Sequence, residues 1–129
     1  MSTVRTNDLK LLVQTKLKTV TAKVYHELAD DNAIYPHIVF NFRRIDLGDL
    51  ARQDYILEVD VWDKLTSTNQ STQQIDNLAD SVEKLLQAEN LPQTNILPTF
   101  YLIDEQNVLD EDKKIRHRKI QFQVQNYER

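Results

Sequence analysis

Histidines and carboxylates are the side chains that could do metal chemistry in this chain of 129 residues. His37, Asp60 and His117 fall on the same parity of three strand-like runs, so two imidazoles and one carboxylate could in principle form a facial metal site. Their spacing matches no metal-site signature, and scattered residues of this kind are usually structural or solvent-facing. We therefore predict no metal site.

Two acidic clusters and many hydroxyl side chains are the remaining candidates for catalysis. Asp30 with Asp31, and Asp110 with Glu111 and Asp112, could act as acid–base pairs, but both clusters fall in expected loops, where carboxylates are usually solvated. No glycine flanks any serine or threonine, so no hydroxyl stands in a nucleophile elbow. The absence of cysteine excludes thiolate chemistry and cysteine-based zinc sites, and a single glycine excludes a glycine-rich phosphate loop. We predict no catalytic residue and no cofactor.

A basic run from Lys113 to Lys119 is the segment that could bind phosphate groups. It follows an acidic cluster that cancels much of its field, and strand geometry would divide it between two faces. We interpret it as the salt-bridged start of a strand in preference to a nucleic-acid contact. The formal net charge of −4 agrees with this interpretation, because nucleic-acid binders normally carry a basic face.

Two helices are expected from apolar residues that recur at helical spacing. The first is predicted over residues 7–29, where the acidic cluster at Asp30 stops it. The second is predicted over residues 71–89, because Ser71 and Gln74 have capping-box spacing ahead of an apolar stripe.

Four strands are expected from alternating apolar and polar residues. Two are predicted at Tyr35–Ile45 and Gln53–Asp63. A third follows Pro98 in TFYLI and is expected to stop at the polar DEQN, and the fourth is IRHRKIQFQVQNY. The predicted fold is a two-layer α+β domain of order α-β-β-α-β-β, with a mostly antiparallel four-stranded sheet and both helices packed on one face.

The outward face of this sheet is expected to carry mixed charge. Its members share strand parity and comprise His37, Asn41, Arg43, Glu58, Asp60, Trp62, His117, Lys119, Gln121 and Gln123. Such a face is usually solvated and stabilised by cross-strand pairs. Trp62 is the exception, because an exposed indole favours contact with another chain.

Composition indicates one globular domain over residues 1–129, with residues 1–6 and 127–129 expected to be flexible. Hydrophobic residues make up 40% and charged residues 28%, which is typical of a packed soluble protein. No apolar run approaches the roughly 20 residues that cross a bilayer. The opening MSTVRTNDLK has no apolar signal core, so we expect no secretion and no membrane contact.

The order of these motifs resembles that of small tail-completion proteins of long-tailed bacteriophages, the tail-terminator and head-to-tail joining group. The features that carry the resemblance are the N-terminal helix leading to YPHIVFNF, the strand YILEVDVWDK, the polar segment that opens the helix IDNLADSVEKLL, and the terminal strand RKIQFQV. The resemblance extends over nearly the whole chain, and LEVDVWDK followed by a helix start is its most specific part. The DLGDLAR and DEQNVLDEDKK segments match no motif of the group.

The resemblance implies a structural virion protein without enzymatic activity. Such proteins form a ring, usually a hexamer, that ends the finished tail tube and joins it to the head connector. The implied partners are other copies of the chain, the tail tube protein and the head–tail connector protein, while DNA passes through the ring without specific binding. The implied location is the head-proximal end of the virion tail, after assembly in the host cytoplasm.

Arg43, Glu58, Asp60, Trp62 and Lys119 are the candidate subunit-interface residues within this picture. Complementary charges across a subunit boundary would give register and specificity, and a buried tryptophan would anchor the contact. The alternative is that Glu58 and Asp60 pair within their own sheet while Trp62 folds over its own core edge. Two other functions remain open: a small non-catalytic adaptor of bacterial origin, and an enzyme with an unrecognised carboxylate site.

Overall fold

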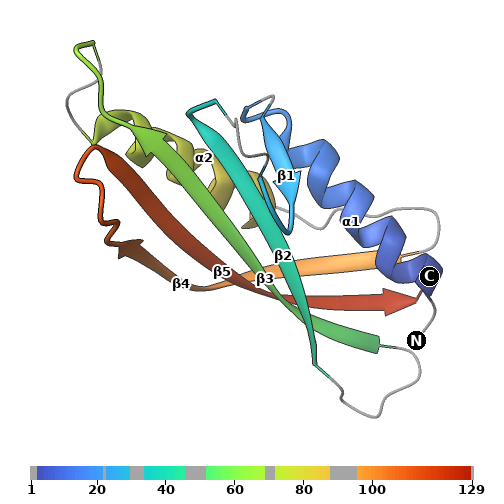
Figure 1. Ribbon diagram of the computed structural model, residues 1–129. Coiled ribbons are helices and arrows are strands. Elements are labelled where there is room, and N and C mark those ends of the chain that lie inside the picture. The colour runs from blue at the N-terminus through green and yellow to red at the C-terminus, as the bar shows by residue number, and fades with distance from the viewer. Residues whose placement is uncertain are drawn as a thin grey trace.

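The computed structural model describes residues 3–21, 23–29, 34–45, 52–68, 72–87 and 96–128. Within these ranges two helices and five strands form a two-layer α+β fold, with both helices on the same side of the sheet (Figure 1). None of the described helices is long and apolar enough to cross a membrane. The elements are, in chain order, α1 (Thr3–Leu17), β1 (Val24–His26), β2 (His37–Ile45), β3 (Arg52–Lys64), α2 (Gln73–Gln87), β4 (Ile96–Val108) and β5 (Ile115–Glu128).

The sheet is mixed and has the order β1-β2-β3-β5-β4. β1 pairs parallel to β2, and the other neighbours are antiparallel. The predicted α+β class and the predicted single helical layer are confirmed. The four-stranded sheet is wrong, because β1 adds a fifth strand that the sequence pattern assigned to the first helix.

The first helix ends twelve residues earlier than predicted, at Leu17 and not at residue 29. Its last turn tightens, with Val20 N donating to Leu17 O at 2.9 Å and Thr19 Oγ1 donating to Lys16 O at 2.7 Å. The chain then extends through Val24, whose side chain is buried beside β2. The apolar residues of the predicted helix over residues 7–29 are therefore divided between α1 and β1. Leu28, which fitted the same apolar stripe, is 82% exposed.

The core lies between the helices and one face of the sheet. Residues of β3 on this face, such as Leu57 and Val59, are fully buried, as are Phe40 and Phe122 on the flanking strands. The remaining buried apolar core consists of Leu9, Leu12, Val13, Leu17, Val24, Ile38, Tyr55, Val61, Ile75, Ala79, Val82, Leu86, Phe100, Ile120 and Val124. Val20, Leu78 and Leu85, which the helical stripes placed in the core, are only partly buried.

The second helix lies within its predicted range and is anchored at its start by β3. Thr72 O accepts from Asp76 N at 2.9 Å, and Thr72 Oγ1 donates to Asp76 Oδ2 at 3.2 Å. The predicted cap at Ser71 lies outside the described residues. Gln74, expected to reach back to that cap, donates to Asp63 Oδ1 at 3.4 Å, which ties α2 to the end of β3.

β4 is longer than predicted, because it continues through the polar DEQN to Val108. A register shift between Leu102 and Asp104 marks a bulge at Ile103 and lets the strand continue beside β5. The acidic cluster that follows shapes the connection to β5: Asp110 Oδ1 accepts from Asp112 N, and Asp112 Oδ1 from Lys114 N, each at 2.9 Å. These carboxylates form local turns, which is the usual role of such residues between strands.

Both ends of the described chain belong to regular elements, α1 and β5. Residues 3–6, expected to be flexible, lie within α1, and residues 127–128 lie within β5. The predicted strands at Tyr35–Ile45 and Gln53–Asp63 correspond to β2 and β3 with small changes at their ends. The glycine-containing loop between them and the cluster at Asp30 lie outside the described residues.

Candidate interaction surface on the outer sheet face

Three ring side chains form one row across the face of the sheet that points away from the helices. The register places His37 opposite Trp62 and Trp62 opposite His117, so the three share this outer face. The rings of Trp62 and His117 stack with centroids 3.7 Å apart and planes 14° apart, and those of His37 and Trp62 are 6.2 Å apart at 16°. The indole thus lies between two imidazoles from the neighbouring strands.

Asp60 fixes the orientation of His117. Its Oδ1 lies 2.6 Å from His117 Nε2, and both side chains are largely withdrawn from solvent, at 13% and 9% exposure. A carboxylate bonded to one ring nitrogen sets the tautomer of the imidazole, so Nε2 carries a proton that points at Asp60. Because Asp60 Oδ1 bonds to His117, this oxygen is not available to bind a ligand.

His37 closes the row beside two tyrosines. The rings of Tyr35 and Tyr25 lie 4.9 Å and 6.0 Å from the His37 ring, which is 5% exposed overall. Burial lowers the pKa of His37, and a backbone hydrogen bond at Ile34 opposes that shift. Burial therefore favours the neutral form of this ring, which packs as an aromatic. Within the described ranges no three histidine, aspartate or glutamate side chains gather closely enough to hold a metal ion.

A second row of polar pairs lies further along the same face. Glu58 Oε1 accepts from Gln121 Nε2 at 3.0 Å, and Glu58 Oε2 is 3.7 Å from Lys119 Nζ. Asp54 Oδ2 accepts from Gln123 Nε2 at 3.1 Å. The Glu58 pairs are partly exposed and individually worth about 1 kcal/mol or less, so they specify strand register more than they stabilise the fold.

All five residues predicted for a subunit interface lie on this outer face. Glu58 and Asp60 pair within the sheet, as the alternative arrangement expected, whereas Trp62 stacks between histidines on the outer face and does not fold over the core edge. Arg43 is exposed, lies on β2 opposite Ile56, and has no ion-pair partner among the described residues. Their role in binding another subunit stays a prediction.

The basic run before and within β5 is divided between the two faces, as predicted. Lys119 lies on the outer face, while Arg118 lies on the helix side and binds Asp76, Glu105 and Asn107. This arrangement confirms a salt-bridged strand start, although the partners come from α2, β3 and β4 and not from the preceding acidic cluster. Because the guanidinium group of Arg118 already bonds to these side chains, it is not available to bind phosphate groups.

Glu83 on α2 adds a third carboxylate to this cluster, beside Asp76 and Glu105. A hydrogen bond to Glu105 raises the pKa of Glu83 to about 7, with further upward contributions from burial and from Asp80, while Arg118 opposes them. A proton shared between two carboxylates could serve acid–base chemistry. The pair joins α2 to β4 and is a helix–sheet contact.

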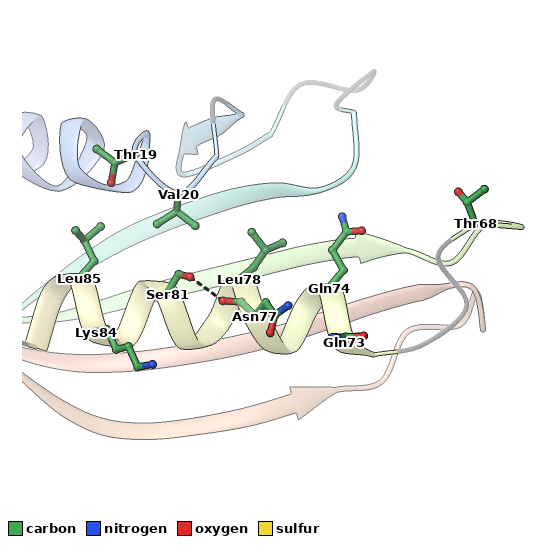
Figure 2. Close-up of a pocket in the computed structure, with 10 residues that line it drawn as sticks. All are labelled: Thr19, Val20, Thr68, Gln73, Gln74, Asn77, Leu78, Ser81, Lys84 and Leu85. Atoms are coloured by element: carbon green, nitrogen blue, oxygen red, sulfur yellow. Dashed lines mark hydrogen bonds between the residues drawn. The ribbon is translucent and has the colours of Figure 1, made fainter.

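An open groove runs between the end of α1 and the exposed side of α2 (Figure 2). It has a volume of about 900 Å³, and its apolar members are Val20, Leu78 and Leu85. Ser81 donates to Asn77 O at 2.8 Å on the α2 side of the groove, and among the described residues that line it Lys84 is the charged one. Side chains of this chemistry can contact another protein but assemble no acid–base pair.

Sequence reasoning missed the exposed apolar part of β4. Tyr101, Leu102 and Ile103 are 49%, 37% and 52% exposed on an edge strand. The signal was present in the sequence, because FYLI is an unbroken apolar run where a half-buried strand needs apolar residues only at alternate positions. Contiguous exposed apolar residues on an edge indicate an interaction surface.

Comparison with known proteins shows likeness to solved structures at the level of the fold. No protein-family model and no curated protein matches the chain. A chain in the solved structure "Virion of native gene transfer agent (GTA) particle" shares the fold, with a TM-score of 0.64 and 9% sequence identity. The match covers 89% of this chain and 91% of that chain. The chain therefore has the fold of a component of that particle along nearly its whole length.

Proposed function

We propose that the chain is a structural protein of a tailed virion, which forms a ring at the head-proximal end of the tail. In this role it ends the tail tube and joins it to the head connector. The observation that carries the proposal is the fold likeness to a gene transfer agent virion component, which spans almost all of both chains. The sequence pattern that resembles tail-completion proteins supports the same role independently.

The chemistry of the described residues fits a structural component better than an enzyme. The carboxylates of Asp110 and Asp112 form turns, and those of Glu58 and Asp54 form an ion pair and a cross-strand hydrogen bond. We propose that Arg43, Glu58, Asp60, Trp62 and Lys119 border contacts between subunits. The partners in the proposal are copies of the chain, the tail tube protein and the connector protein. The acidic chain would let DNA pass without holding its phosphates.

Deletion of the gene in the genome that encodes it tests this function directly. Loss of a tail terminator should leave full heads separate from tails, with tubes of irregular length, in electron micrographs of lysates. Expression of the wild-type chain from a second locus should restore joined particles of normal tail length. Normal particles from the deletion strain, or absence of the chain from purified particles by peptide mass spectrometry, would contradict the proposal and favour a host adaptor.

A further inference from the structure

One ring nitrogen of His37, on the outer face of the sheet, is buried without a hydrogen bond. This atom, Nδ1, is closed off from solvent, and no group in the described part of the chain bonds to it. Buried polar atoms are nearly always paired, so the exception calls for a physical reason. A neutral imidazole needs an acceptor for one N–H, whereas a protonated imidazole needs acceptors for two. The surroundings of His37 therefore suit the neutral ring and offer a second proton no acceptor.

The groups packed against this ring are aromatic. They are Tyr25 of β1, Tyr35 just before β2, and Trp62 of β3. Attraction between a cation and these ring faces offsets part of the cost of a buried charge, but it does not replace the water that a charged imidazole loses. Burial accordingly lowers the pKa of His37, and no charged side chain of the described residues is among the causes of the shift.

The other titratable groups at this end of the sheet have partners or reach solvent. Asp60 on β3 bonds to His117 on β5 at 2.6 Å. On the opposite face of β1, His26 Nε2 lies 3.9 Å from Glu27 Oε1, and the His26 side chain is 28% exposed. Burial lowers the pKa of His26, Lys10 of α1 lowers it further, and Glu27 opposes them. Because His26 is partly exposed, water can solvate its charged form.

β1 is the strand that opens most easily. It pairs with β2 over three residues, Val24–His26, at the edge of the sheet (Figure 1). β3, in the middle of the sheet, pairs with β5 from Arg52 to Lys64. Short edge elements with few contacts open at a lower free energy than central strands. Tyr25 contacts the His37 ring on the outer face, so movement of that ring removes a contact that holds β1 in place.

We infer that His37 is a pH-sensitive switch: its neutral ring holds β1 and the Trp62 indole at the start of β2, and a second proton on the ring releases both. The unfolded or opened chain binds this proton more readily than the closed chain, so the closed form loses stability as pH falls below 6.5. The helices and the β3-β5-β4 part of the sheet stay folded. The switch goes beyond the proposed virion role and does not depend on it.

Trp62 reports on the switch, because it is the single tryptophan of the chain. Acrylamide is an uncharged quencher, so its quenching constant measures exposure of the indole whatever the charge of the neighbouring histidines. Between pH 8 and pH 5 this constant should rise about twofold or more in wild type, as the ring of His37 leaves one face of the indole. His37→Phe and His37→Gln cannot take up the proton, and both should give the same constant at the two pH values.

The other two histidines supply matched controls, since the chain has three in all. His26→Gln removes the histidine of β1 and should keep the rise in quenching. His117→Gln leaves an amide that can donate to Asp60, and it should also keep the rise. Glu83, with a pKa of about 7, titrates in the same range between α2 and β4, but it is present in every variant and cancels in the comparison.

Amide hydrogen exchange locates the opening within the sheet. Ile38 N donates to Lys23 O and Glu27 N donates to Phe40 O, so these two amides close the β1–β2 pairing. After correction for the intrinsic exchange rate, their protection should fall by up to about tenfold per pH unit below 6.5. The amide of Val59, in the middle of β3, should keep its protection, and circular dichroism should show the fold retained at pH 5.

Four results would overturn the switch. They are unchanged quenching of wild type down to pH 5, a rise that survives both His37 variants, a rise that disappears with His26→Gln, and an equal loss of protection at Val59, which would mean global unfolding. The proposed function is judged separately by the gene deletion and by the composition of purified particles, so either proposal can fail while the other stands.

Discussion

Replacing Glu83 by glutamine should make the chain more stable at neutral and alkaline pH, and not at acid pH. Glu83 on α2 shares a proton with Glu105 on β4, and this hydrogen bond is the main reason that the pKa of Glu83 rises to about 7. The Glu83→Gln side chain still donates to Glu105, but it has no proton to lose. The substitution therefore mimics the protonated pair at every pH.

The sign of the effect follows from proton binding. The unfolded chain binds this proton with the ordinary pKa of 4.5, so between pH 4.5 and about 7 the folded state holds more protons than the unfolded state. The free energy of unfolding therefore falls as pH rises through this window. At 1.36 kcal/mol per pKa unit the full shift would cost about 3 kcal/mol. Because the side chain is partly exposed, solvent screening reduces the expected cost to about 1–2 kcal/mol.

Urea unfolding at pH 5 and pH 8 measures this difference. Glu83→Gln should exceed wild type by about 1–2 kcal/mol at pH 8 and should equal it within error at pH 5. Histidine titration occurs in both proteins and cancels in the comparison. Glu111→Gln, an exposed carboxylate in the β4–β5 connection, is the control and should show the same small offset at both pH values. An equal offset for Glu83→Gln at the two pH values would refute the shared proton.

Four further variants test other parts of the structure. Val59→Asp places an unpaired charge at a fully buried position of β3 and should lower stability by about 3–5 kcal/mol in urea unfolding; an unchanged midpoint would contradict the core assignment. Asp112→Ala removes the acceptor of Lys114 N and should lower the free energy of unfolding by about 0.5–1.5 kcal/mol in urea unfolding. An unchanged free energy of unfolding would show that the turn does not depend on this hydrogen bond. Trp62→Ala, and Glu58→Lys combined with Asp60→Lys, should retain the circular dichroism of the fold and fail to complete tails; tails joined to heads at wild-type yield would remove these residues from the interface.

The sequence alone determined the elements whose pattern is local. Alternation in an extended chain puts every second side chain on one face, so the outer set from His37 to Gln123 could be named before any strand was placed. The apolar stripe of α2 likewise identified Val82 as a core residue, and it is fully buried. The acidic composition and the absence of cysteine were sufficient to argue against the commonest binding and catalytic chemistries.

Tertiary structure decided which of these faces and edges meet. Val24 fitted a helical stripe as well as a strand, and pairing with β2 selected the strand. β4 continued through a polar segment because β5 supplied a continuous partner across the bulge. The aromatic row of His37, Trp62 and His117 required knowledge that β5 lies next to β3. Local propensity records how each segment tends to fold, whereas strand order depends on contacts between residues far apart in the chain, which no local pattern encodes.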